Sequence, residues 1–208
     1  MIIKPDNEML SYSGRIDFDD RLAPVLVYAC SSIGMKFTGT SLKAVIANHR
    51  SCWTNELGYF IDGEQKRFTL SSDEKKTYTL AEGLSEGTHE LLLFKRMDSC
   101  HTFTFYGFEI DDGAEVLPLP EKPKRKMEFF GDSVSCGEVS EAVAYVGKPD
   151  PEHDGEYSNS WYSYAWMTAR KLNAQIHDTS QGGISLLDDT GWFAAPHYKG
   201  VESCYDKI

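Results

Sequence analysis

Residues 127–137, MEFFGDSVSCG, divide the chain into two parts of different character. The mostly apolar segment 127–130 predicts a short strand that runs directly into Gly131-Asp132-Ser133. Downstream, apolar or small side chains recur with helical spacing over residues 160–172, and a second strand is predicted at residues 174–179. A strand, a loop, a helix and a second strand in this order predict a βαβ unit with a right-handed crossover and parallel strands.

Upstream of this stretch, the first 115 residues show the pattern of an all-β domain. Short apolar or alternating segments are separated by turn residues such as Asp62-Gly63-Glu64, a tight hairpin signal. Short segments without a helix between them favour a β-sandwich of the jelly-roll type. The predicted strands are residues 24–29, 35–37, 42–47, 59–61, 67–70, 76–80, 89–95 and 102–110.

A proline-rich and basic segment joins the two parts. Pro118, Pro120 and Pro123 stand too close together for a strand ladder, and a basic cluster accompanies them. We therefore expect a combined β and α/β architecture. It consists of a jelly-roll β-sandwich at residues 1–115, a linker at residues 116–126, and the N-terminal part of an α/β domain with a parallel sheet at residues 127–208.

The composition narrows the classes of partner. With 32 acidic and 21 basic residues the net charge is −11, which disfavours nucleic acids and anionic membrane surfaces but not a neutral sugar. No apolar run approaches the ~20 residues that span a bilayer. The N-terminus lacks the apolar core of a signal peptide, so we expect a cytoplasmic protein, or a secreted one if a signal was removed.

The cysteines point to the same compartment. They include no Cys-x-x-Cys pair, so they indicate neither a zinc site nor a dense disulfide framework. Buried or partly buried reduced thiols are the simpler interpretation, and they fit a reducing cytoplasm. The five residues are Cys30, Cys52, Cys100, Cys136 and Cys204.

Two segments fall at the carboxyl ends of the predicted parallel strands, where open α/β sheets collect reactive groups: residues 131–137 and 180–183. A serine on the turn that leaves a strand can present its hydroxyl at the rim of the sheet. Its own N–H and one from a neighbouring glycine loop can then face a developing oxyanion. A Gly-Asp-Ser tripeptide is by itself more often an ordinary turn. The strand before Ser133 and the helix and glycine loop after it favour a nucleophile.

The stretch MEFFGDSVSCG resembles the first block of the SGNH (GDSL) hydrolases, and its Cys-Gly resembles the variant found in carbohydrate esterase family 2. Residues 12–18 (YSGRIDF), 37–42 (FTGTSL) and 59–63 (YFIDG) are similar to stretches of that family's N-terminal jelly roll. Residues 165–172 (AWMTARKL) resemble the helix that follows the nucleophile block. The resemblance covers most of the chain and implies an incomplete SGNH-type α/β domain behind the sandwich.

This resemblance implies a serine carbohydrate esterase that removes O-acetyl groups from poly- or oligosaccharides, similar to an acetylxylan esterase. It implies that Ser133 is the catalytic nucleophile and that the Ser133 N–H is one oxyanion donor. Gly182 is the implied second donor, with Gly183 as the alternative if the register is shifted. Asp132 is expected to be structural. The chemistry requires no metal and no cofactor, and the expected partner is an acetylated carbohydrate.

The general base that the family uses, a histidine in an Asp-x-x-His arrangement near the C-terminus, has no recognisable counterpart here. The spacing occurs twice, at residues 98–101 in the sandwich and at residues 150–153 in a polar insertion that we expect to be solvated. Both occurrences stand in the wrong chain order, so we interpret them as chance. The other expectations are structural roles for His49, His89 and His101, and at most weak catalytic candidacy for His177 and His197.

We therefore expect the nucleophile part of an esterase, with weak or no activity as a lone monomer. A missing C-terminal portion or an oligomer would complete it, because two parallel strands leave sheet edges unpaired. One alternative is a carbohydrate-binding or non-catalytic remnant, with Trp53, Tyr59 and Phe60 on a glycan surface. Another is a different SGNH activity, such as a lipase or thioesterase. Trp192 follows the glycine loop and would flank an acyl site.

Overall fold

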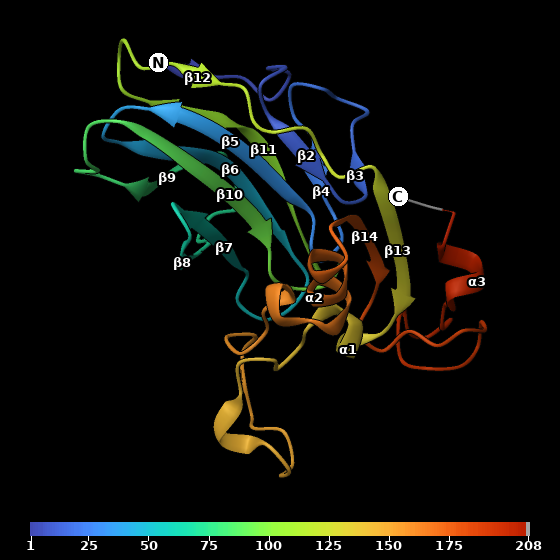
Figure 1. Ribbon diagram of the computed structural model, residues 1–208. Helices are drawn as coiled ribbons and strands as arrows, with labels where there is room; N and C mark the ends of the chain where they lie inside the picture. Colours follow the sequence, from blue (N-terminus) through green and yellow to red (C-terminus); the bar gives the residue numbers. More distant parts are fainter. Residues whose placement is uncertain (207–208) are drawn as a thin grey trace.

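The computed structural model describes residues 1–206. The strands within residues 2–117 form two antiparallel sheets packed face to face (Figure 1). The strands of the first sheet are β1 (Ile2–Ile3), β3 (Ile16–Asp17), β4 (Val25–Leu26), β6 (Leu42–Arg50), β9 (Lys76–Ala81) and β11 (His101–Ile110). The strands of the second sheet are β2 (Ser11–Ser13), β5 (Ser32–Thr38), β7 (Glu56–Ile61), β8 (Glu64–Thr69), β10 (Thr88–Lys95) and β12 (Val116–Leu117).

Neighbouring strands in these sheets are mostly distant in sequence. The order is β3-β4-β11-β6-β9 in one sheet, with β1 beside β11, and β12-β5-β10-β7-β8 in the other, with β2 beside β5. The inner faces meet in one apolar core in which Phe103, Phe105 and Phe108 are fully buried. The predicted β-sandwich is confirmed.

The hairpin between β7 and β8 shows why one turn was easy to predict. It has a two-residue loop, and both of its residues, Asp62 and Gly63, have positive φ, as a type I′ turn requires. The shortest strands have no comparable turn signal in the sequence. The strand expected at residues 24–29 is reduced to β4, and Val116–Leu117, which the sequence places in the linker, pairs with β5 as β12. A two-residue strand next to a proline is too short to produce a pattern.

The rest of the described chain contains the predicted βαβ unit. Strands β13 (Arg125–Gly131) and β14 (Ala174–Ser180) pair in parallel, with helices between them in the chain. The helix expected over residues 160–172 is interrupted at Ser163, whose hydroxyl accepts a hydrogen bond from the Trp166 N–H and so starts a new helix. The elements are β13 (Arg125–Gly131), α1 (Ser133–Cys136), the 3-10 helices η1 (Val143–Tyr145) and η2 (Ser160–Tyr162), α2 (Tyr164–Lys171), β14 (Ala174–Ser180) and α3 (Val201–Cys204).

Helix α2 lies between the sandwich and the parallel strands (Figure 1). Its buried residues Ala165, Trp166 and Ala169 face two partners at once. On one side they meet the outer face of the sandwich, and on the other the parallel strands. This second core consists of Ala29, Cys30, Phe94, Cys136, Ala165, Trp166, Ala169 and Ile176, with Phe60, Leu92, Met127, Phe129 and Trp161 packed against it. In the part of the chain that is described, no helix is both long and apolar enough to cross a membrane.

Candidate active site

The parallel pairing brings the two predicted site segments to one edge of the small sheet. Gly131, the last residue of β13, is the register partner of Ser180, the last residue of β14. Ser133 and Gly182 therefore each lie two residues beyond neighbouring strand ends. Because adjacent strands are only ~4.8 Å apart, both residues sit at the same carboxyl-end rim.

Ser133 is the first residue of α1, and three neighbours set its position. The Asp132 carboxylate accepts a hydrogen bond from the Val134 N–H over 3.0 Å and caps the helix, which is the structural role expected of it. A Cβ on Gly131 would lie 2.1 Å from Ser135 Oγ, so any larger residue here would force Ser135 to move. Gly137 ends α1 at φ 80°. As a first-turn residue, Ser133 has an N–H outside the intrahelical hydrogen bonds.

The loop after β14 is held by both parts of the molecule. The Gln181 N–H donates to the Gly131 carbonyl over 3.1 Å, which continues the parallel pairing. The Gly182 N–H donates to Asp98 Oδ2 over 2.7 Å. Asp98 belongs to the turn between β10 and β11 and takes the hydrogen bond that a substrate oxyanion at Gly182 would need. The assignment of Gly182 as oxyanion donor, with Gly183 as its alternative, stays a prediction.

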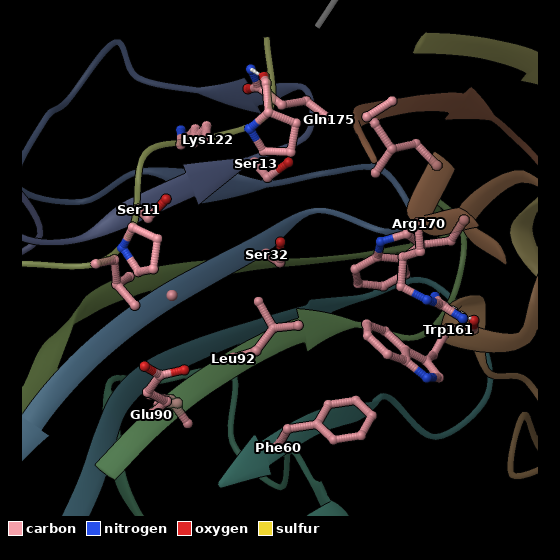
Figure 2. A pocket seen from close by; sticks show the side chains of 18 of the residues that line it. Ser11, Ser13, Ser32, Phe60, Glu90, Leu92, Lys122, Trp161, Arg170 and Gln175 are labelled. Carbon is pink, nitrogen blue, oxygen red and sulfur yellow. Dashed lines mark hydrogen bonds between the residues drawn. The ribbon is translucent and has the colours of Figure 1, made fainter. Parts of the chain in front are cut away.

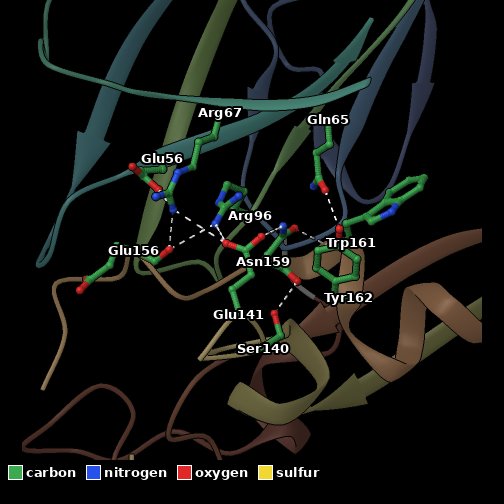
Figure 3. Close-up of polar contacts among 10 residues, drawn as sticks. All are labelled: Glu56, Gln65, Arg67, Arg96, Ser140, Glu141, Glu156, Asn159, Trp161 and Tyr162. Carbon is green, nitrogen blue, oxygen red and sulfur yellow. Dashed lines mark hydrogen bonds and ion pairs between the residues drawn. The ribbon is translucent and has the colours of Figure 1, made fainter. Parts of the chain in front are cut away.

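A polar network connects strand β10 of the sandwich to the C-terminal end of α1 (Figure 3). The buried Arg96 guanidinium lies 2.7 Å from Glu141 Oε2, and Glu141 Oε1 accepts from Asn159 Nδ2 over 2.6 Å. The Asn159 N–H donates to the Gly137 carbonyl over 3.0 Å, and Ser140 Oγ donates to the Asn159 carbonyl. The sandwich thus supports the short helix that carries Ser133. Sequence reasoning missed this role because the residues carry no pattern.

Most of the polar insertion is at least partly exposed, as expected, but His153 is not. The side chain of His153 is only 10% exposed; its ring lies 4.9 Å from that of Trp53, and its Nε2 lies 4.0 Å from Glu138 Oε1. The expectation that this histidine is solvated was wrong, because the insertion folds back on the turn after β6. Burial and the neighbouring Asp98 raise the pKa of Glu138 above its ordinary value.

The remaining histidines have contacts away from Ser133. His101 is fully buried beside Cys100 and the Trp53 carbonyl, and His89 is held by Asp62 and the Ser85 carbonyl. His49 contacts Thr104 Oγ1 over 3.0 Å. These three are structural, as predicted. His177 and His197 are exposed, and within residues 1–206 no histidine ring hydrogen-bonds to Ser133.

A groove with a volume of about 610 Å³ opens at the opposite end of the parallel strands, near Ala174 and Gln175 (Figure 2). It runs between the outer face of the second sheet, the segment 119–123 and helix α2. The Arg170 guanidinium lies 3.6 Å from the centre of the Trp161 ring. The walls of the groove include Ser11, Ser13, Ser32, Phe60, Glu90, Leu92, Lys122, Trp161, Trp166 and Arg170.

The three aromatic residues considered for a glycan surface are separated by the fold. Tyr59 is buried in the sandwich core, where its hydroxyl donates to the Leu80 carbonyl. Trp53 packs against His153 in the turn after β6. Only Phe60 reaches the groove, and its ring centre lies 4.5 Å from that of Trp161.

Comparison with known proteins identifies the family to which this chain is similar. The description "Carbohydrate esterase 2 N-terminal" matches residues 12–120, just over half of the chain. The cellulase/esterase CelE of Acetivibrio thermocellus is 32% identical over 192 residues, which is 92% of this chain and 23% of that protein. An acetylxylan esterase / glucomannan deacetylase of Cellvibrio japonicus is 26% identical over 164 residues, 76% of this chain and 44% of that protein.

The similarity to solved structures extends over both the sandwich and the parallel-strand part of the chain. A family two carbohydrate esterase from Clostridium thermocellum, in complex with cellohexaose, has a TM-score of 0.78 and 30% identity. The match covers 90% of this chain and 55% of that one, so the present chain spans about half the length of that relative. The chain belongs to carbohydrate esterase family 2.

Proposed function

We propose that this chain carries the nucleophile, Ser133, of a serine esterase that removes O-acetyl groups from poly- or oligosaccharides. The observation that carries the proposal is the place of Ser133. It is the first residue of a capped helix, at the carboxyl end of β13 and beside the loop that follows β14. The names of the relatives, which include acetylxylan esterase and glucomannan deacetylase, support the substrate class.

In the proposed reaction, Ser133 Oγ attacks the acetyl carbonyl and gives up its proton to a histidine. The Ser133 N–H and one amide of the loop at residues 180–183 stabilise the oxyanion. If that amide is Gly182, the Asp98 carboxylate has to yield it. The protonated histidine then gives this proton to the sugar oxygen as the bond between that oxygen and the acetyl carbon breaks. Water afterwards hydrolyses the acetyl-serine. No histidine ring within residues 1–206 hydrogen-bonds to Ser133, so we assign the histidine's role to polypeptide outside this sequence.

Labelling with a fluorophosphonate, followed by peptide mass spectrometry, tests the nucleophile. We expect slow modification of Ser133 and its loss in Ser133→Ala, whereas Ser72→Ala, in the turn between β8 and β9, keeps the label. Hydrolysis of 4-nitrophenyl acetate by the 208-residue chain should be weak. Absence of the label from Ser133 in folded protein would contradict the proposal, and hydrolysis at ordinary enzyme rates would contradict the assignment of the base.

The groove of Figure 2 supports a second candidate function, the binding of carbohydrate without catalysis. It combines apolar surface from Phe60 and Leu92 with hydrogen-bonding groups from Glu90 and Gln175, which suits the apolar C–H face and the hydroxyl groups of a sugar ring.

Titration with cellohexaose, followed by tryptophan fluorescence, tests this second function. Ser13→Trp fills the groove and should abolish the response, while Ser133→Ala should leave it intact. A response that survives Ser13→Trp would exclude the groove.

A further inference from the structure

The end of strand β10 contacts the candidate site through successive residues. The Lys95 carbonyl accepts from Ser160 Oγ over 2.7 Å, and Arg96 binds Glu141. Two residues later, Asp98 reaches the loop after β14. One short segment of the sandwich therefore contacts both the support of α1 and the loop that faces it.

The Asp98 carboxylate is fully engaged. Its Oδ1 accepts from the Cys100 N–H over 3.0 Å, within its own turn. Its Oδ2 accepts from the Gly182 N–H over 2.7 Å and from Gln181 Nε2 over 2.8 Å. The neighbouring Ser99 hydroxyl donates to Gln181 Oε1, so the amide of Gln181 is held at both ends.

The turn that carries Asp98 is itself held by the buried side chain of Lys95. Lys95 is completely buried, and its ammonium donates to the Met97 carbonyl over 2.7 Å and to the Asp98 carbonyl. Burial lowers the pKa of Lys95 to about 8. Since both carbonyls belong to the turn, the contact fixes the direction in which the Asp98 side chain points.

The Asp98 carboxylate approaches the backbone of the loop closely at Gly182. A Cβ at position 182 would lie 2.5 Å from Asp98 Oδ2, so the carboxylate and the loop backbone are in direct contact only because residue 182 is glycine. The glycine that the sequence offered as an oxyanion donor is thus the attachment point of the sandwich.

We propose that Asp98 is a positioning residue of the esterase site: from the sandwich, it fixes the loop at residues 180–183 opposite Ser133 through the Gly182 N–H and the Gln181 amide. The proposal rests on the function proposed for Ser133. It makes the jelly roll a structural part of the catalytic site instead of an independent attached module.

Amide hydrogen exchange by NMR tests the contact independently of any reaction. In Asp98→Asn the Gly182 N–H should exchange about tenfold faster or more, as expected when a charge-assisted hydrogen bond is weakened. The Ile176 amide of β14 should be unaffected, and the exposed Asp19→Asn should change neither amide. Unchanged exchange at Gly182 in folded Asp98→Asn would overturn the proposal.

The rate of Ser133 phosphonylation tests the consequence for the site. It should fall in Asp98→Asn, whereas a rise would mean that the carboxylate blocks a donor and would overturn the positioning role. If wild-type Ser133 is never labelled, the proposed function fails, and the exchange of Gly182 still decides the contact. Should Asp98→Asn not fold, Ser99→Ala loosens the same loop through Gln181 and should speed Gly182 exchange by a smaller factor; no change would overturn the proposal.

Discussion

The sandwich buries Phe103, Phe105 and Phe108 between two sheets drawn from one continuous segment, whereas the parallel strands bury Ile176 against a helix whose other side rests on the sandwich. The first core is complete within its own segment. The second core includes Phe94 from strand β10 of the sandwich. The dependence therefore runs in one direction, because the sandwich can close its core without the parallel strands but they cannot close theirs without it.

The surface of the parallel-strand part also shows that this part does not bury its own apolar side chains. Several large apolar side chains are exposed there. They include Phe130, Tyr164, Met167, Leu172, Leu186, Leu187 and Trp192. A two-stranded sheet with one covering helix offers too little surface to bury them.

The largest expected effect separates the two cores directly. Trp166→Ala removes a side chain that is 6% exposed from the shared core, at a cost of about 3–5 kcal/mol. Hydrogen exchange should become fast in β14 and stay slow in β6. Phe105→Ala, a matched loss in the sandwich core, should accelerate exchange in both strands. Equal loosening of β6 and β14 by Trp166→Ala would show that the two regions unfold as one.

The contact between Cys30 and Asp178 sharpens the comparison through pH. The buried Asp178 carboxylate lies 3.3 Å from Cys30 Sγ, and burial raises its pKa from 3.8 to about 7. The folded state holds this proton up to about pH 7, while the unfolded state loses it near pH 4. This group therefore lowers the free energy of unfolding as pH rises between those values, and a pKa difference of this size corresponds to roughly 4 kcal/mol.

Asp178→Asn removes that loss. Relative to wild type, the variant should be unchanged or slightly weaker near pH 4 and more stable at pH 8, by up to roughly 4 kcal/mol. Urea unfolding at the two pH values measures the difference. A stability difference that does not depend on pH would mean that Asp178 ionises normally in the folded protein.

A smaller effect is expected at the turn into α1. Gly131→Ala places a Cβ 2.1 Å from Ser135 Oγ, and the overpacking should cost about 1–3 kcal/mol and shift the helix that carries Ser133. Gly34→Ala in β5 is the control, since its Cβ would meet Leu119 Cδ1 at 3.2 Å and Ser11 at 3.6 Å, without the severe overlap at Gly131. Thermal unfolding of the two variants gives the comparison, and equal melting temperatures would contradict it.

The smallest effect is expected at the surface. Trp192 is 81% exposed, so Trp192→Ala should change the free energy of unfolding by less than about 0.5 kcal/mol. The contrast with Trp166 in the same region tests whether burial alone ranks the tryptophans. A loss of more than about 1 kcal/mol in urea unfolding would show that Trp192 packs in solution.

Local patterns predicted the elements well where they were long or had special turns. Alternation predicted the long strands, Asp62-Gly63 predicted the hairpin, and the segment before Ser133 predicted β13. Three two-residue strands of the described chain, β1, β3 and β12, were not predicted because two residues form no period, and a fourth, β4, was predicted too long. Ser163 divides the expected helix because its hydroxyl caps α2, a competition that spacing alone does not reveal.

What the sequence determined by itself was the order of the elements and the placement of Ser133 and Gly182 after successive parallel strands, because periodicity and turn chemistry are local. Only the tertiary structure decided which distant residues contact the segments that carry Ser133 and Gly182. Asp98, 84 residues before Gly182, reaches that amide because β10 ends against the parallel strands, and no local pattern records a contact across such a separation. Packing of α2 on the outer face of the sandwich brings these distant segments together and determines the surroundings of the nucleophile.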